Sequence, residues 1–337
     1  MNLSSTILGS PQVSPQDHET DHRASGIRQS CRMPEKKRML DRLRELHRIQ
    51  ILSRNDLREA GLSTHAITRA VRGGRLTRIR NGVYAVGDVP EDVQTALHVG
   101  GRISCVSLLR LLGIFVLEAT GVHIQVRPHL SRSRDRRPPD AVLHWVACDD
   151  VGLPHAVSID DAVRQSIRCQ APRAAIATLD SVLHHRLLTR EHLVSIFQGL
   201  PERYRPLLAL VDGIAESGPE SFMKLILRTL GVRFEMQVEI QEVGRADFVV
   251  EGWLIIECDS REFHQGWDQQ MRDRARDLGA ARLGYVCIRV PAMDIFTRQG
   301  EVREAIRAVI VAFGPRWRGT ASVPKLRRSG RGKPRSG

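Results

Sequence analysis

The chain has 337 residues, and it carries 51 Lys and Arg against 38 Asp and Glu, a formal net charge of +13. That length suits about two domains, and the excess of positive charge favours nucleic acid as a partner ahead of a membrane surface. Only 4% of the residues are aromatic, which argues against broad base-stacking platforms. No apolar run is long enough to span a membrane, and the N-terminus lacks the pattern of a secretory signal. We therefore expect a cytoplasmic protein with no membrane partner.

The cysteines show neither a CxxC pair nor a Cys/His spacing typical of zinc sites. They favour a reduced, cytoplasmic setting and argue against zinc as a cofactor. The six residues are Cys31, Cys105, Cys148, Cys169, Cys258 and Cys287.

Both ends of the chain are predicted to be disordered. Residues 1–35 are polar and poor in large apolar side chains, and Met33 is an alternative start. Residues 316–337 contain eight basic residues and no acidic residue. A tail of this kind attracts phosphate without selecting a sequence.

Residues 36–90 have the pattern of a winged helix-turn-helix domain. Apolar residues recur at helical spacing in the first part, and two further short helices follow, each preceded by a capping residue. Two short strands joined by a tight turn close the domain. The predicted caps and turn are Ser53, Ser63 or Thr64, and Asn81-Gly82.

Arginine accumulates over the third helix and the hairpin of this domain. No acidic residue occurs between Ala60 and Gly87. A charge run is often only a solvated face, but charge of one sign on the helix that would enter the major groove, and on the wing beside it, favours binding of double-stranded DNA. The predicted DNA-binding residues are Arg69, Arg72, Arg75, Arg78 and Arg80.

The same stretch resembles the N-terminal domain of AbiEi-type antitoxins. It shares their Gly-Leu-Ser before the recognition helix, at Gly61-Leu62-Ser63, and their closing basic segment, at residues 80–84. The resemblance implies a DNA-binding transcriptional regulator of a toxin–antitoxin system. A cognate toxin or a second copy of the chain is then the expected protein partner.

Residues 91–212 are predicted to form an α+β middle domain of the AbiEi-like kind. Helix-rich stretches surround two predicted strands, VHIQVR and AVLHWVA. His123 and His144 lie in these strands. Because no partner accompanies them at a regular spacing, we interpret them as structural histidines and not as metal ligands.

A break rich in Gly, Pro and Ser precedes a further domain, residues 213–315. Glu220 opens its first helix, where a carboxylate suits the helix dipole, and the strands that follow carry Asp247, Glu257 and Asp259. Glu257 and Asp259 project from one face of their strand. Asp247 shares that face only if the connecting loop has an odd number of residues or a bulge shifts the register. Three converging carboxylates would suit Mg²⁺ or Mn²⁺.

This domain resembles the PD-(D/E)XK nuclease superfamily, in its very short patch repair (Vsr-like) branch. The motifs that carry the resemblance are Glu220-Ser221, Asp247-Phe248, Glu257-Cys258-Asp259-Ser260 with His264, Asp273 with Arg276, and Val286 with Arg289. The resemblance implies a metal-dependent endonuclease in which Asp247, Glu257 and Asp259 bind the metal. Glu220 and His264 would complete the catalytic set, His264 as a general base or acid.

Two residues depart from that pattern, and two others have a second interpretation. Ser260 stands where the relatives carry glycine, and Lys224 where a second acid is expected. Arg276 and Arg289 could face a DNA phosphate, or they could form ordinary salt bridges with Asp273 or Asp277 on an amphipathic helix.

The predicted fold class is therefore mixed α+β. It comprises an N-terminal winged helix-turn-helix, an α+β middle region and a C-terminal restriction-endonuclease-like α/β domain with a mixed sheet flanked by helices. Two functions fit this arrangement. One is a metal-dependent DNA endonuclease targeted by the winged helix, and the other is an antitoxin-like DNA-binding regulator whose nuclease fold is catalytically degenerate.

Overall fold

The computed structural model describes residues 35–118, 120–128, 137–146, 152–259 and 267–317. The predicted disordered ends lie almost wholly outside these residues. Within them the fold is mixed α+β, as predicted, and it divides into two compact units. The first unit comprises residues 1–170 and 192–200, and the second comprises residues 171–191 and 201–337. No helix in the described part is both long and apolar enough to cross a membrane.

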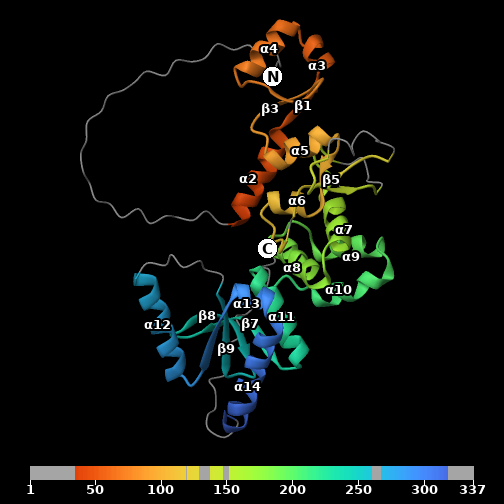
Figure 1. The fold of residues 1–337 in the computed structure, drawn as a ribbon. Coiled ribbons are helices and arrows are strands. Elements are labelled where there is room, and N and C mark those ends of the chain that lie inside the picture. The colour runs from red at the N-terminus through yellow and green to blue at the C-terminus, as the bar shows by residue number, and fades with distance from the viewer. Residues whose placement is uncertain (1–34, 119, 129–136, 147–151, 260–266, 318–337) are drawn as a thin grey trace, which may run out of the picture. The chain divides into compact units, whose positions relative to one another are not determined.

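The first unit begins with a winged helix (Figure 1). Three helices precede and surround a three-stranded antiparallel sheet in the order β1-β3-β2. The elements are α2 (Glu35–Arg48), β1 (Gln50–Ser53), α3 (Arg54–Glu59), α4 (Thr64–Arg72), β2 (Thr77–Arg80) and β3 (Val83–Val86). The three helices and the hairpin match the prediction, whereas β1 was not predicted.

The capping residues of the winged helix are those that the sequence indicates. Ser53 forms a capping box with Asp56, because each side chain bonds the other residue's backbone N–H. The Ser63 hydroxyl accepts a hydrogen bond from Ala66 N at 3.2 Å and starts α4. Gly82 takes the left-handed conformation, with φ of 78°, that the hairpin turn requires. Leucine and isoleucine side chains of α3, α4 and the segments after them pack with Tyr84 in one buried cluster.

The rest of the first unit surrounds a small mixed sheet. Its order is β4-β5-β6, with β4 antiparallel and β6 parallel to the central β5. Helices α6 and α7 pack against each other beside it. The elements are α5 (Glu91–Val99), β4 (Arg102–Ile103), α6 (Cys105–Leu111), β5 (His123–Gln125), β6 (Val142–His144) and α7 (Ile159–Cys169); α9 (Arg190–Gln198) lies mostly in this unit.

The second unit contains a four-stranded mixed sheet in the order β10-β9-β8-β7. Strands β7, β8 and β9 are antiparallel neighbours, and β10 runs parallel to β9, which requires the crossover that α12 supplies. Helix α12 lies on one side of the sheet, and α11, α13 and α14 lie on the other (Figure 1). The elements are α8 (Pro172–His184), η2 (Glu202–Tyr204), α10 (Arg205–Leu210), α11 (Gly218–Leu230), β7 (Phe234–Ile240), β8 (Gly244–Val250), β9 (Leu254–Asp259), α12 (Trp267–Arg282), β10 (Val286–Pro291), α13 (Ala292–Thr297) and α14 (Gln299–Trp317).

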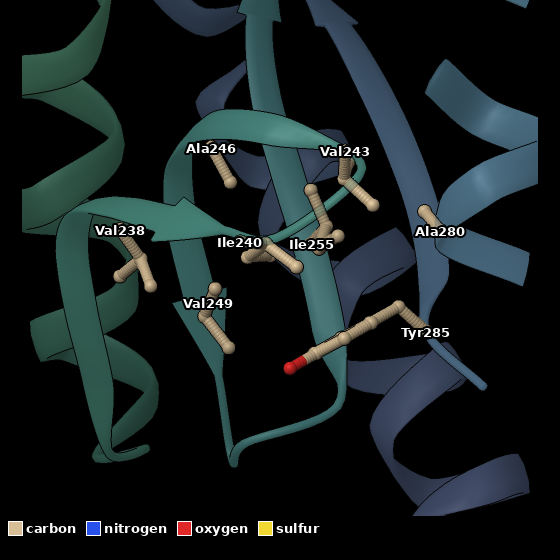
Figure 2. Packing of buried hydrophobic residues seen from close by; sticks show 8 residues of the cluster. All are labelled: Val238, Ile240, Val243, Ala246, Val249, Ile255, Ala280 and Tyr285. Atoms are coloured by element: carbon tan, nitrogen blue, oxygen red, sulfur yellow. The ribbon is translucent and has the colours of Figure 1, made fainter. Parts of the chain in front are cut away.

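The face of this sheet beneath α12 is a compact apolar cluster. Figure 2 shows aliphatic side chains of β7, β8, β9 and the turn before β8 on one side of the sheet, with Ala280 of α12 and the Tyr285 ring. All the residues drawn there are buried. Their packing fixes the strands whose ends carry the predicted carboxylates.

Candidate DNA-binding surface and carboxylate cluster

Helix α4 presents a polar, positively charged face to solvent. Ile67 and Ala70 are buried in the core of the winged helix. The side chains on the opposite face are exposed, and none of them is acidic; they are Thr64, His65, Thr68, Arg69 and Arg72. A helix that has short polar residues and arginines on its free face can approach both base edges and phosphates in a major groove.

The predicted arginines differ in exposure. Arg69, Arg72 and Arg78 are exposed, and Arg75 and Arg80 are partly buried. The Arg69 guanidinium lies 3.3 Å from His65 Nδ1 on the same helix face. Arg78 and Arg80 belong to β2, next to the turn at the tip of the wing. The helix and the wing thus carry the positive charge on the two elements that a winged helix uses against a duplex.

Strands β8 and β9 are joined by three residues, Glu251 to Trp253, which is the odd number that the carboxylate hypothesis needs. The register pairs Val250 with Leu254 and Phe248 with Ile256. Continued by one step, it sets Asp247 opposite Glu257. At this end of the strand pair, the Asp247 side chain bonds the neighbouring backbone: its Oδ2 accepts a hydrogen bond from Cys258 N at 2.8 Å.

Glu220, on the first turn of α11, is the third carboxylate in this neighbourhood. Its side chain accepts hydrogen bonds from Glu216 N at 2.9 Å, from Ser217 Oγ at 2.7 Å and from Gln237 Nε2 at 2.6 Å. The first two complete the N-terminal cap that the sequence predicts. The third bond joins α11 to β7. The negative charge of Asp247 also raises the pKa of Glu220.

Gln237 is a member of this cluster that the sequence did not reveal. It is a non-glycine residue with a φ of 53°, within β7 and at the level of Asp247 in β8. Its Nε2 bonds Glu220, while its buried Oε1 has no hydrogen-bond partner. Strained backbone of this kind is costly and collects at functional sites, but a lone Gln in a strand gives no sequence signal.

Burial raises the pKa of all three carboxyl groups. For Glu257 the pKa rises to about 7, first through burial and then through the negative charge of Asp247, against the opposing effect of the Arg276 guanidinium. Burial also raises the pKa of Asp247 and of Glu220, and in Glu220 the charge of Asp247 adds to the rise. The nearby guanidinium groups therefore offset only part of the cost of burying the negative charges of the cluster.

Replacing Glu257 by Gln should flatten the pH dependence of stability in metal-free buffer. Because the folded-state pKa of about 7 exceeds the ordinary value of 4.5, the free energy of unfolding falls as pH rises between these values. Glu257→Gln removes that fall, which amounts to at most about 3 kcal/mol. Urea unfolding at pH 5 and pH 8 with EDTA measures it, and Glu239→Gln, at an exposed position of β7, is the control. An unchanged pH dependence in Glu257→Gln would contradict the buried carboxylate cluster.

Of the remaining predicted residues that the structure describes, only Arg276 contacts the carboxylate cluster through an ion pair. Asp259 is exposed at the end of β9, two residues beyond Glu257. Arg276 contacts Glu257 at 3.3 Å, and Arg289 pairs with Asp277 of α12 at 2.8 Å, so Arg289 forms a salt bridge of the alternative interpretation, whereas Arg276 pairs with a member of the carboxylate cluster. Ser260 and His264 lie outside the described residues, as does the side chain of Asp273.

Lys224 does not point into the carboxylate cluster. Its side chain is fully buried and bonds Asp180 Oδ2 at 2.7 Å and Asp212 Oδ1 at 2.9 Å. Asp180 also accepts hydrogen bonds from the backbone N–H groups of Asp212 and Gly213. Lys224 therefore belongs to a structural ion pair that joins α8, α11 and the segment between α10 and α11.

The donor chemistry of the cluster suits a hard divalent cation. Asp247, Glu257 and Glu220 offer only carboxylate oxygens, which Mg²⁺ and Mn²⁺ prefer. Among the residues that the structure describes, however, the oxygens of these three do not form a close-set group of metal ligands. Bound there, such an ion would offset the unfavourable burial of negative charge.

A separate group of side chains in the first unit brings the two histidines together with two cysteines. The ligand atoms of Cys105, His123, His144 and Cys169 all lie within 4.8 Å of one another. His123 and His144 therefore have ligand-type neighbours in space that their spacing in the sequence did not indicate. The partners are 18, 21 and 25 residues apart in sequence, so no short motif could reveal them.

The winged helix and its basic face have the form of a DNA-binding module. Residues 40–87 match the family described as "Transcriptional regulator, AbiEi antitoxin". The match supports the antitoxin-type resemblance of the N-terminal module.

Two Mycobacterium tuberculosis proteins are similar over a longer stretch. They are the uncharacterized protein Rv2248 of strain ATCC 25618/H37Rv and the uncharacterized protein MT2308 of strain CDC 1551/Oshkosh. Each is 28% identical over 261 residues, which cover 70% of this chain and 93% of the relative. The similarity therefore extends well beyond the winged helix.

Proposed function

We propose that this protein is a DNA-binding transcriptional regulator of the antitoxin type. The observation that carries the proposal is the exposed face of α4, where Arg69 and Arg72 stand among short polar residues and no acid is present. The arginines supply the attraction to phosphate, and Thr64, His65 and Thr68 are placed to reach base edges. The family match over residues 40–87 supports the same role.

Titration of a labelled duplex with the full chain at several salt concentrations tests this function. Binding should weaken as salt rises, because each neutralised phosphate releases condensed counterions. Absence of duplex binding at low salt would overturn the proposal. A cytoplasmic location remains a prediction from the sequence, and a toxin or homodimer partner remains a prediction of the antitoxin resemblance.

A second candidate function is hydrolysis of DNA phosphodiesters in the second unit. It is supported by the pairing of Asp247 with Glu257 across β8 and β9, and by Glu220 beside them. A bound divalent cation would polarise the scissile phosphate and lower the pKa of a coordinated water. Asp247 and Glu257 would hold the cation, while the Arg276 guanidinium, 3.3 Å from Glu257, favours the charged form of that carboxylate. The nuclease resemblance and its Mg²⁺ or Mn²⁺ cofactor remain proposals.

Plasmid cleavage with Mg²⁺ or Mn²⁺ separates the two functions. An active nuclease would cut in the wild type and fall to the level of protein-free DNA in Asp247→Ala and Glu257→Ala, because each loses a proposed metal ligand. Glu239→Ala, on the exposed side of β7, should retain full activity. Equal background cutting by all four proteins would argue against nuclease activity. The regulator would then be the favoured function, and the carboxylates would have no catalytic role.

A further inference from the structure

Four ligand-type side chains meet in the first unit, and they differ in chemistry from the carboxylate cluster of the second unit. Each comes from the end of a different element: Cys105 begins α6, His123 begins β5, His144 ends β6 and Cys169 ends α7. Their ligand atoms all lie within 4.8 Å of one another. Two thiols and two imidazoles form the Cys₂His₂ ligand set of structural zinc sites.

The distances within the group match a tetrahedral site. His123 Nδ1 lies 3.1 Å from His144 Nε2 and 3.6 Å from Cys169 Sγ. Tetrahedral zinc with its usual bond lengths holds two nitrogens about 3.3 Å apart, and a nitrogen and a sulfur about 3.5 Å apart. His123 therefore already lies at nearly the separations from His144 and Cys169 that one tetrahedral ion requires, and all four ligand atoms lie within 4.8 Å of one another.

Neighbouring polar groups hold the ligands in place. His123 N donates to Ser107 Oγ at 2.9 Å, and His123 O accepts from Ser104 N at 3.0 Å. On the sheet face that carries His123 and His144, Gln125 accepts a hydrogen bond at 2.6 Å from Gln165, which lies one helical turn before Cys169 on α7. Supporting hydrogen bonds of this kind orient the ligands of metal sites.

The backbone conformation of Cys105 also shows that this ligand position is constrained. Its φ is 50°, in the left-handed region that non-glycine residues seldom adopt. Strain of this kind persists where the surrounding structure and a function maintain it. It directs a buried thiol, at the very start of a helix, toward the two histidines.

We propose that Cys105, His123, His144 and Cys169 bind one Zn²⁺ ion. Thiolate and imidazole ligands select zinc over Mg²⁺, Mn²⁺ or Ca²⁺, and four protein ligands leave no open position, which makes the site structural. Two thiolates balance the charge of the ion, and binding releases their protons. Cys105 and His123 are buried while Cys169 is exposed, so the ion can enter from the Cys169 side.

The consequence of such a site is a cross-link within the first unit. Strands β4, β5 and β6 have two or three residues each, too few to form a stable sheet without support. One ion would join β5 and β6 to the facing ends of α6 and α7. The region that follows the winged helix would then depend on metal for its rigidity.

Metal analysis of the untagged full chain, purified without chelator, tests the proposal. About one zinc per chain is expected, and X-ray absorption should give Zn–S distances of about 2.3 Å and Zn–N distances of about 2.0 Å. Cys169→Ser and His144→Asn should lose most of the zinc. Cys287→Ser and His184→Asn, with a thiol and an imidazole outside the group, should keep it.

A second measurement, the effect of chelation on the melting temperature, keeps the proposal testable if the variants fold poorly. Chelation should lower the melting temperature of the wild type and of Cys287→Ser, and it should change Cys169→Ser very little because that variant already lacks the metal. Full zinc in Cys169→Ser and His144→Asn would overturn the proposal. So would a wild-type chain that is free of metal after purification in zinc, whether its thiols are free or joined as a Cys105–Cys169 disulfide.

Discussion

Replacing Arg69 and Arg72 together by Ala should weaken binding of the full chain to duplex DNA and flatten its salt dependence. Both side chains are exposed on the free face of α4, where they would neutralise phosphates or reach base edges. The slope of log affinity against log salt should fall by about 0.9 for each phosphate that is no longer neutralised, so by close to 2 for the pair. If either arginine reads a guanine, a further loss of about 1–3 kcal/mol appears only on the specific site.

A matched double variant controls for the change in net charge. Arg205 and Arg307 are exposed in the second unit, and each pairs only with a glutamate on or beside its own helix, at 2.6 Å and 3.4 Å. Arg205→Ala/Arg307→Ala removes the same two charges and should retain the wild-type slope. An equal effect in both double variants would mean that the whole positive charge of the protein, and not the α4 surface, drives binding.

Replacing Lys224 by Met should be the most destabilising single change in the second unit. Lys224 and Asp180 are both 0% exposed and lie 2.7 Å apart. Removing the ammonium leaves the Asp180 carboxylate buried without its charge partner, a loss of about 3–5 kcal/mol. Thermal or urea unfolding of the full chain measures it.

Arg228→Met is the matched control for that prediction. Arg228 is one turn along the same helix and pairs with the same Asp212, at 3.4 Å, but its side chain is 35% exposed. Removing its charge should cost about 1 kcal/mol or less. If Lys224→Met is no more destabilising than Arg228→Met, the buried ion pair does not have the role assigned to it.

The winged helix could be predicted in detail because its signals are local. Ser53 and Ser63 begin helices by bonding residues three positions away, and Asn81-Gly82 forms a turn from its own backbone preferences. Strand β1 was missed because its four residues pair only with β3, more than thirty residues later in the chain. Short strands without an adjacent partner leave little pattern in a sequence.

The carboxylate cluster was predictable in part. The odd loop that brings Asp247 level with Glu257 follows from strand alternation and from the position of Glu251 and Gly252. The approach of Glu220 and the strained Gln237 depends on how α11 packs beside β7, which no local pattern encodes. The exposure of Asp259 likewise follows from where the sheet ends.

The cysteine and histidine group and the Lys224 ion pair were not predictable for the same reason. Both assemble residues from segments that are distant in sequence, Lys224 with Asp180 across 44 positions and Cys105 with Cys169 across 64. A lysine in an amphipathic helix, like a histidine in a strand, is ordinarily a surface or core residue. Only the packing of the elements shows that these side chains meet.

Protein–DNA cross-linking of the full chain, followed by peptide mapping, tests the central claim most directly. If the protein reads duplex DNA through its winged helix, the cross-linked peptides should come from α4 and from the β2–β3 wing, residues 64–86. Binding that places all cross-links in other parts of the chain, such as the basic residues 316–337 or the strands that carry Asp247 and Glu257, would contradict it.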